Sequence, residues 1–581
     1  MRLNLLFLLF FLSFAFACSG GGGGGSESDD EITDGGAISA DVPAGDKVLA
    51  FNDLGMHCMD REFSIFSILP PFNVINAQVL TRDSQGYPVV MDDSRVELRY
   101  NAVSDSSGSI NTYSTGKTDF WQYAGSLFGT QLQPGEGLTG LFMPGDNLEN
   151  RGPQSMAYND THEWFNAEGV PITPLDDNFR PSTYSLMRVS AYSRQNGEQI
   201  GFLDVVVPVA SETDCRNCHA TGQMAAEDPG LSWSANSDPE VQSKQNILIL
   251  HDDVQGTNLR NSTPVLCSRC HYSAPLDLSG AGPTGPQRSL PTFSQAMHGY
   301  HGGLVDNLNN PIFPPGAVVE DSCYQCHPGS TTQCQRGAMK TGNMECNACH
   351  GDMLAVGGEF PLLADGSLDG TNDSGARRPW QDLPRCQSCH TGDAVNHLTG
   401  AGLVFDSSGI RLRQAYLSGD ASASPLLAAN TRFAEELDTL FRNSKGHGGL
   451  ACEACHGSTH AIWPNADPDS NDNIAARQLQ GHAGTIIECA ACHATGSLPL
   501  TVNGPHGLHN VNDPRWIDEE HGEIYARNKN NCKACHGLDL AGTVLAKTAA
   551  ARTFRVEDEG TVRLAAGEPV RCNRCHGMPR L

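Results

Sequence analysis

The chain has a single long apolar run, and it stands at the N-terminus. Leu3 to Phe16 is apolar apart from Asn4 and Ser13. That length is short for a bilayer span but typical of the core of a secretory signal. No later stretch is apolar over a sufficient length to cross a membrane. The sequence therefore excludes a bundle of transmembrane helices.

Basic residues are scarce. Lys and Arg number 38 against 66 Asp and Glu, which gives a formal net charge of -28. A surface of this sign repels a phosphate backbone, so nucleic acid is excluded as a partner. A basic partner protein, a metal ion or a mineral surface fits the charge better.

Helical periodicity and apolar residues are both sparse after about residue 210. Gly and Pro are frequent there, and Ser424 to Arg442 carries the best helical pattern. Such a stretch holds too little apolar material to bury an ordinary core of its length. A bound group must therefore supply part of the buried apolar surface, and folding should depend on its insertion.

Cysteine, by contrast, is abundant and regularly placed. Of the 21 cysteines, 18 fall in nine copies of Cys-x-x-Cys-His. This is the attachment signature of c-type haem, in which two thiols form thioethers to the porphyrin and the histidine binds the iron. Nine copies exclude chance and predict nine covalently bound c-type haems. The motifs, each given by its two cysteines and its proximal histidine, are Cys215, Cys218 and His219; Cys267, Cys270 and His271; Cys323, Cys326 and His327; Cys346, Cys349 and His350; Cys386, Cys389 and His390; Cys452, Cys455 and His456; Cys489, Cys492 and His493; Cys532, Cys535 and His536; and Cys572, Cys575 and His576.

The remaining histidines are candidates for the second axial ligand. An iron with two protein ligands transfers electrons, whereas an open position can bind a substrate. Ten further histidines follow residue 210, close to the nine that bis-histidine ligation requires. Methionine is the competing ligand at any one haem. The distal candidates are His251, His298, His301, His397, His447, His460, His482, His506, His509 and His521.

Two features allow more than one interpretation. His57 lies in a dense group of ligand-type residues, Asn52 to Asp60, and either caps a haem of the later region or belongs to a polar turn. Cys58 and Cys334 fall outside the motifs. In an oxidising compartment they could form a disulfide. Alternatively, Cys334 could give a long-spaced attachment to the haem of His350.

The N-terminus indicates export and anchoring. Small residues precede Cys18, and six glycines follow Ser19, as at a bacterial lipoprotein cleavage site. Lipidation of Cys18 would make the protein an outer-membrane lipoprotein, on the periplasmic face or the cell surface. Ordinary cleavage after Ala17 is the alternative. The expected parts are a signal peptide at 1–17, a lipidated Gly-rich tether at 18–44, a β domain without haem at 45–210 and a nine-haem cytochrome c domain at 211–581.

The two large parts should differ in fold. The first contains short β-rich runs between Gly, Pro, Asn and Asp clusters, which predicts an all-β domain, a sandwich or small barrel. The second should be an irregular, haem-cored domain with few short helices. The β-rich runs are Val74 to Leu80, Tyr87 to Met91, Val96 to Tyr100, Leu186 to Tyr192 and Ile200 to Val209.

These motifs support a family resemblance. The lipoprotein start, the haem-free β part and the stretch from Cys323 through Cys334 to His350 resemble the outer-membrane and extracellular multihaem c-type cytochromes of metal-reducing, Geobacter-like bacteria. The resemblance implies electron export to iron oxides or other extracellular acceptors. Periplasmic or outer-membrane cytochromes would be the redox partner proteins.

Three functions follow as hypotheses. The first is an electron carrier or terminal metal reductase, moving electrons across or away from the outer membrane, with no catalytic residue or substrate pocket. The second is a multihaem oxidoreductase of the nitrite, hydroxylamine or tetrathionate type. Several such enzymes place Lys at the motif position of the active haem, and no Cys-x-x-Cys-Lys occurs here. The third is a subunit of a cytochrome filament.

Overall fold

A computed structural model of the chain describes most residues after the N-terminal segment. The signal peptide, the tether with Cys18, Cys389 and His397 lie outside the described residues. Those described belong to one compact unit. They are 45–358, 380, 382–386, 390, 403–405, 411–413, 432–433, 439–517, 521–556 and 560–578.

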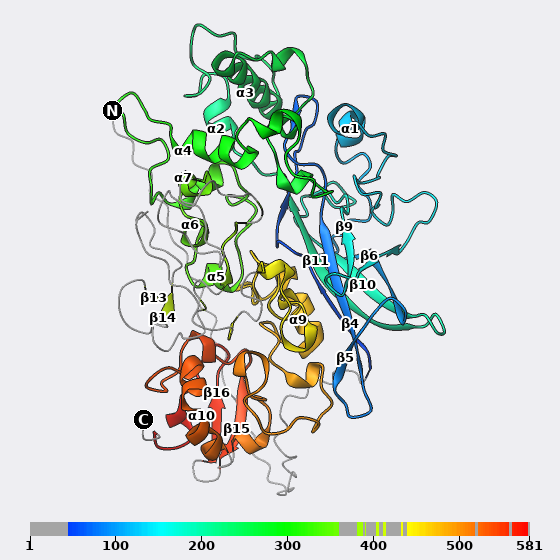
Figure 1. Ribbon diagram of the computed structural model, residues 1–581, viewed down its shortest axis with the longest axis vertical. Coiled ribbons are helices and arrows are strands. Elements are labelled where there is room, and N and C mark those ends of the chain that lie inside the picture. The colour runs from blue at the N-terminus through cyan, green and yellow to red at the C-terminus, as the bar shows by residue number, and fades with distance from the viewer. Residues whose placement is uncertain are drawn as a thin grey trace, which may run out of the picture. The chain divides into compact units, whose positions relative to one another are not determined.

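Two five-stranded sheets dominate the first part of the chain (Figure 1). One has the order β1-β4-β9-β8, with β5 also paired to β4, and the other has the order β2-β11-β10-β6-β7. Pairing is antiparallel except that β2 runs parallel to β11. The strands are β1 Lys47–Phe51, β2 His57–Cys58, β4 Val74–Arg82, β5 Pro88–Met91, β6 Val96–Val103, β7 Gln154–Ser155, β8 Ala157–Asn159, β9 Trp164–Glu168, β10 Tyr184–Ser193 and β11 Gln199–Ala210.

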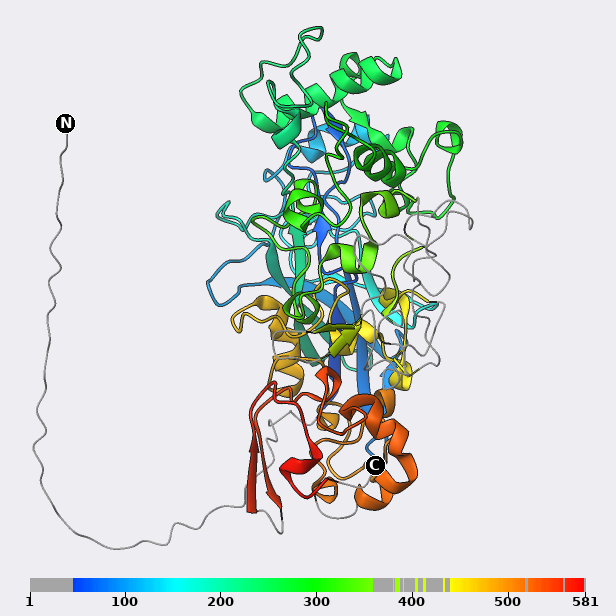
Figure 2. The ribbon, with the colours of Figure 1, turned by 90° about the vertical axis from the view of Figure 1, so that its left-hand side faces the viewer.

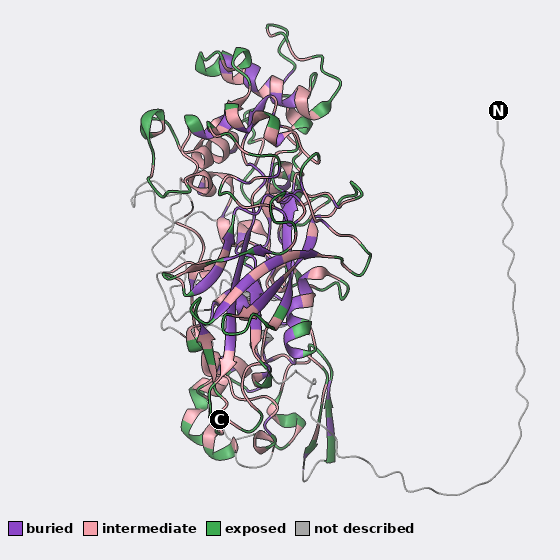
Figure 3. Cartoon of the chain, turned by 90° about the vertical axis from the view of Figure 1, so that its right-hand side faces the viewer, coloured by how far each residue is buried: buried purple, intermediate pink, exposed green. Residues whose placement is uncertain are grey.

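The sheets form a half-barrel around a shared apolar core. Strand β6 shows the usual alternation, since Val96, Leu98, Tyr100 and Ala102 are buried while the residues between them are half-exposed. Strand β4 is buried over seven consecutive residues because it is central, with β1 on one edge and β9 and β5 on the other. Figure 3 shows the buried residues concentrated in these strands.

The expected β-rich runs each coincide with a strand, so the prediction of sheets in this region is confirmed. The sheets and the short helices elsewhere agree with the coarser part of the expected fold class, whereas the haem core of the later part stays a prediction. The helix expected over Ser424 to Arg442 falls mostly outside the described residues, and its end enters a single 3-10 turn, η10 Phe441–Asn443.

Helices are mostly short. Two longer ones were not expected, α3 and α10, of 17 and 16 residues. Helix α3 begins with Asp238, whose carboxylate accepts hydrogen bonds from two amides of the first turn, followed by Pro239; it ends at Gly256 in the left-handed region. The α-helices are α1 Phe120–Phe128, α2 Arg216–His219, α3 Pro239–Gln255, α4 Tyr300–Gly302, α5 Ala338–Thr341, α6 Cys346–His350, α7 Met353–Val356, α8 Cys452–His456, α9 Ile474–Gln480 and α10 His521–His536.

There are also three small two-stranded pairings among the described residues, of which the β15–β16 pair is seen in red in Figure 2. They join β3 Phe66–Ser67 to β12 Val265–Leu266, β13 Leu403–Phe405 to β14 Arg411–Arg413, and β15 Arg552–Val556 to β16 Gly560–Leu564. The β3–β12 pair is parallel and links the first part of the chain to the second. Within the described residues, no helix has both the length and the apolar character needed to cross a membrane.

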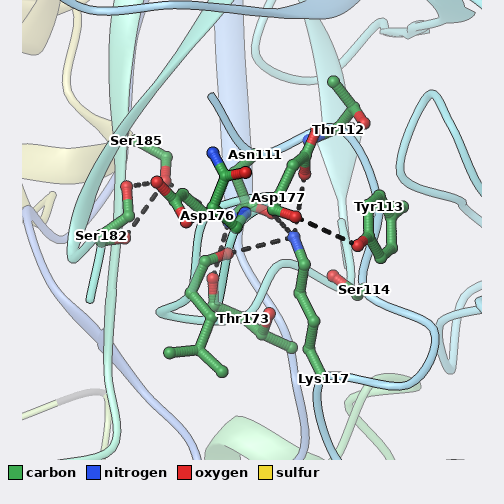
Figure 4. A network of polar contacts seen from close by, with 12 residues as sticks. Asn111, Thr112, Tyr113, Ser114, Lys117, Thr173, Asp176, Asp177, Ser182 and Ser185 are labelled. Atoms are coloured by element: carbon green, nitrogen blue, oxygen red, sulfur yellow. Dashed lines mark hydrogen bonds and ion pairs between the residues drawn. The ribbon is translucent and has the colours of Figure 1, made fainter. Parts of the chain in front are cut away.

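A buried lysine ties two long loops of the half-barrel together (Figure 4). The Lys117 ammonium donates to Asn111 Oδ1 at 2.8 Å, Leu175 O at 3.1 Å and Asp177 Oδ1 at 3.0 Å, so its three hydrogens all have acceptors. It also lies over the Tyr113 ring. Because the cation is fully paired, its burial is tolerated and the loops are fixed to each other.

Candidate functional site

Eight of the nine Cys-x-x-Cys-His stretches are described in full and fold as one helical turn, while of the fifth only Cys386 and His390 are described. The histidine amide donates to the carbonyl of the first cysteine, as at His219 to Cys215 with 2.8 Å and His390 to Cys386 with 2.8 Å. On a helical turn, positions i, i+3 and i+4 share one face. The two thiols and the imidazole of a motif therefore point the same way. The remaining turns are η2 Cys267–Arg269, η7 Cys323–Gln325, α6, α8, η13 Cys489–Ala491, the end of α10 and η17 Cys572–Arg574.

Seven motif histidines face a second histidine ring from elsewhere in the chain. The second ring is in every case one of the distal candidates. The ring centroids are separated by 6.3 Å for His219 and His301, 6.4 Å for His271 and His251, 6.0 Å for His327 and His298, 6.2 Å for His350 and His460, 5.8 Å for His456 and His506, 6.1 Å for His493 and His447, and 5.6 Å for His576 and His521.

These separations suit two imidazoles on opposite sides of one metal ion. Metal–imidazole bonds are roughly 2.0–2.1 Å long, and each ring centre lies about 1 Å beyond its nitrogen, so a metal between two rings puts the centroids about 6 Å apart. Ordinary aromatic pairs reach similar distances. The recurrence of the pairing at seven separate motifs favours the ligand arrangement.

The other two motif histidines are His536 and His390, and neither is among the seven ring pairs above. His509 lies close to His536: burial first, and then the charge of His536, lowers the pKa of His509 to about 4. The His390 ring packs against that of Phe433, with centroids 5.9 Å apart, and burial and then the charge of His506 lower the pKa of His390. The candidate that follows this motif in sequence, His397, lies outside the described residues.

Many of these rings have one nitrogen fixed by the backbone. Because a carbonyl oxygen can only accept, Nδ1 must carry the hydrogen, and Nε2 is left with a bare lone pair. This is the arrangement in which a histidine binds a metal through Nε2. The contacts from Nδ1 to carbonyl oxygen are His271 to Pro291 at 2.9 Å, His298 to Ser294 at 3.0 Å, His301 to Met297 at 2.7 Å, His460 to Leu54 at 2.9 Å, His506 to Arg432 at 2.6 Å, His536 to Val570 at 3.2 Å and His576 to Gly577 at 2.7 Å.

Burial also favours the neutral form of several motif imidazoles by lowering their pKa. It lowers the pKa of His219 to about 4 and that of His456 to about 3, in each case helped by a neighbouring histidine. A neutral imidazole is the form that binds a metal. The Nδ1 atoms of His219, His493 and His509 are buried without a hydrogen-bond partner.

A connected cavity of about 2530 Å³ runs between these motifs. Protein interiors are close-packed, and pockets for a single small ligand are roughly 300–1,000 Å³. A void several times larger, bordered by paired imidazoles and thiols, fits a set of flat macrocycles. Its walls include Cys215, Cys218, His219, Cys267, Cys270, His271, Cys323, Cys326, His327, Cys346, Cys349, His350, Cys386, His390, Cys452, Cys455, His456 and Cys535, and the distal candidates His251, His298, His301, His447, His460 and His506.

Two histidine candidates have other partners. His57 Nε2 lies 2.9 Å from Asp53 Oδ1, and His57 does not line the large cavity. His482 has both nitrogens engaged, Nδ1 with Ala483 O at 2.8 Å and Nε2 with Glu488 Oε1 at 2.9 Å. Burial lowers the pKa of His482, but the Glu488 carboxylate outweighs this and raises it overall. The structure thus places neither ring against a described motif histidine.

The half-barrel contributes contacts that sequence reasoning missed. On β4, Gln78 Oε1 accepts from the Ala451 amide at 2.9 Å, and its amide group donates to Gly449 O at 3.1 Å. Arg82 on the same strand donates to Cys492 O at 2.9 Å and to His493 O at 3.3 Å. These side chains bond the backbone of His493 and that of residues two and four positions after His447. A polar residue within an otherwise apolar β-rich run, such as Gln78, was the feature of the sequence that could have indicated these contacts.

The chain matches no family model, no curated protein and no solved structure. Its described residues also contain no group of three or more His, Cys, Asp or Glu side chains arranged to hold a bare metal ion.

Proposed function

We propose that the protein is an exported nine-haem c-type cytochrome that carries electrons towards extracellular acceptors such as metal oxides. The observation that carries the proposal is the set of seven motif histidines, each facing a distal histidine at 5.6–6.4 Å. Haem iron, when bound, supplies one-electron redox chemistry. The motif cysteines would hold each porphyrin, and the histidine pairs would close both axial positions to substrate.

The arrangement of the thiols supports close spacing between many of the sites. Burial raises the pKa of Cys326, Cys386 and Cys455, and charges of thiols from other motifs raise each one further. The Cys346 thiol lies beside that of Cys323 and lowers the pKa of Cys323 to about 7. Neighbouring motifs therefore lie side by side. The thiols that act on one another are Cys326 with Cys215 and Cys218, Cys386 with Cys349 and Cys452, Cys455 with Cys492, and Cys532 with Cys572.

The charge of the chain and its proposed export indicate which partners fit. An excess of 28 negative charges favours a basic partner protein or a mineral surface over nucleic acid. Lipidation at Cys18 would hold the protein at the outer membrane, where periplasmic or outer-membrane cytochromes could supply electrons. The half-barrel would position the histidine pairs, as Gln78 and Arg82 do for His447 and His493.

One observation favours a second candidate, a multihaem oxidoreductase. Among the described residues the His390 ring pairs with Phe433 at 5.9 Å, which cannot bind iron, while the nearby His506 pairs with His456. An open sixth position there would admit a small ligand. This haem is the one at which an enzyme activity would reside.

A low-temperature EPR spectrum of the oxidised full-length protein, with spins counted against total haem, tests the proposal. We expect nine haems per chain, all low-spin. High-spin iron at the site of His390 alone would favour the oxidoreductase, and loss of that signal on adding cyanide would verify an open position. A chain that carries no haem, or high-spin iron at most sites, would overturn the proposal.

A further inference from the structure

Cys58 and Cys334 are the two described cysteines that the motifs leave over. Cys58 ends β2 and is paired with Ala210 at the end of β11. Cys334 lies in the loop after the third motif, where its amide donates to Pro328 O at 3.2 Å. Both side chains line the same large cavity, and both are thiols in this structure.

One guanidinium joins the two segments that carry these cysteines. Arg336 Nη1 donates to the carbonyl of Gly55, three residues before Cys58, and to the carbonyl of Cys334 at 3.3 Å. Arg336 is itself held by Asp472 through contacts of 2.6 and 2.8 Å, and its side chain is 3% exposed. The backbones on either side of the cysteine pair are therefore fastened to a common rigid point.

The rest of the Cys334 loop is fixed to the same edge of the half-barrel. The Glu212 carboxylate, just beyond β11, accepts from the amides of Thr331 at 2.7 Å and Thr332 at 2.6 Å. The Tyr184 hydroxyl, at the start of β10, accepts from the Gln333 amide at 2.9 Å. Because β2 is the neighbour of β11, these bonds bring the loop to the strand that carries Cys58.

The thiols also act on each other. Burial raises the pKa of Cys58, and the neighbouring Cys334 raises it further. Burial raises the pKa of Cys334 to about 11, against the opposing charge of Arg336. A charge has such an influence only on a nearby group.

A competing role for Cys334 is attachment to the haem of His350, since Cys334 also lies near Cys346. However, helix α6 already places Cys346 and Cys349 on one face beside His350, so that motif is complete without a third thiol. Cys58 belongs to no motif, and Cys334 is its thiol neighbour.

We propose that Cys58 and Cys334 form a disulfide in the exported protein, fastening the Pro328–Arg336 loop to β2 and withholding Cys334 from the attachment reaction at Cys346. The two thiols lose two protons and two electrons as the S–S bond forms. A protein disulfide of a thiol oxidase outside the cytoplasm accepts them and becomes a dithiol. The inference rests on the proposed export but not on electron transfer.

Alkylation of denatured, full-length holoprotein, followed by peptide mapping and intact mass, tests the inference. Without reductant we expect no label on Cys58 or Cys334, and after reduction one label on each. The same intact mass gives the number of haems per chain. A failure of the cytochrome proposal can therefore be distinguished from a failure of the disulfide inference. Label on either residue before reduction would overturn the disulfide. A Cys334 peptide that stays unlabelled after reduction and carries haem would show the third thioether instead.

Matched variants give a second measurement. In Cys58→Ser, the Cys334 thiol should be labelled without reductant, and in Cys334→Ser the Cys58 thiol should be. If the two residues act as a unit, each single variant and the double variant should lower the melting temperature by the same amount. Additive losses in the double variant would show that the cysteines act independently.

Discussion

At the scale of single residues, the histidines differ in what their Nε2 atom meets. In His460, Nδ1 bonds the Leu54 carbonyl at 2.9 Å and the ring faces His350 at 6.2 Å. In His482, Nε2 meets the Glu488 carboxylate instead. The sequence placed both near motifs and could not separate them, because Leu54 lies about four hundred residues from His460 in the chain.

Replacing these two residues should give opposite results. His460→Ala removes the ring opposite His350, so we expect one of the nine haems to become high-spin in a quantified EPR spectrum. His482→Ala should leave all nine low-spin but lower the melting temperature, because Glu488 loses a partner. An unchanged spin count in His460→Ala would contradict the pairing.

A buried carboxylate within a motif predicts a pH-dependent stability. Glu453 is 0% exposed, and burial, then the charge of Asp53, raises its pKa well above the usual range. A raised carboxyl pKa in the folded state means that stability is present at low pH and is lost as the pH rises above the unfolded value.

The variant Glu453→Gln should therefore melt at the same temperature as the parent near pH 4 and about a few degrees higher at pH 8. Thermal unfolding followed in the Soret band at both pH values measures the difference. Glu523→Gln, at a side chain that is 79% exposed, is the control and should change little. A stability gain of equal size at both pH values would rule out titration of Glu453 as the cause.

At the scale of elements, a buried ion pair joins the loop after the third motif to the start of α9. Arg336 and Asp472 are 3% and 2% exposed, with an Nε–Oδ2 distance of 2.6 Å. Removing one partner leaves an unpaired buried charge, which costs about 3–5 kcal/mol.

Arg336→Met alone should lower the free energy of unfolding by about 3–5 kcal/mol, and adding Asp472→Leu should restore much of it. Guanidinium denaturation of the two variants and the parent measures this. A double variant as unstable as Arg336→Met would contradict the explanation and would attribute the loss to the bonds with Gly55 and Cys334.

The elements also show how far the sequence could predict the structure. Apolar alternation identified the long strands, and the fixed spacing of the motif predicted that its thiols and imidazole act together. Helix α3 was missed because its buried side includes polar residues such as Lys244 and Asn246, although Asp238, Pro239 and Gly256 mark its ends. The pairing of distant histidines depends on long-range packing, which local patterns do not contain.

At the scale of the whole molecule, the two parts of the chain bury different material. Most of the half-barrel core comes from its own strands, such as Phe51, Ile75, Leu98 and Met187, and a few apolar residues of the later part, including Ala476 of α9, add to it. The later part instead surrounds the large cavity. The first part should therefore be stable without haem, whereas the second should not.

Limited proteolysis of the haem-free full chain tests this difference. We expect a resistant fragment that retains β4, β10 and β11, and rapid cleavage between about residues 211 and 578. The holoprotein is the control and should resist cleavage in both regions. Equal resistance of the later region without haem would show that the polypeptide alone fills its core.

The contacts from β4 have a consequence for the speed of transfer under the proposed function. Electron tunnelling slows steeply as the gap between donor and acceptor widens, so thermal fluctuation of the gap spreads the rate. Gln78 and Arg82 stand on one strand at the centre of a sheet and bond the backbone on both sides of the His447–His493 pair. A stiff sheet would hold the two ligands of this one haem more firmly than a loop would, so the distance from that haem to its neighbours would fluctuate less.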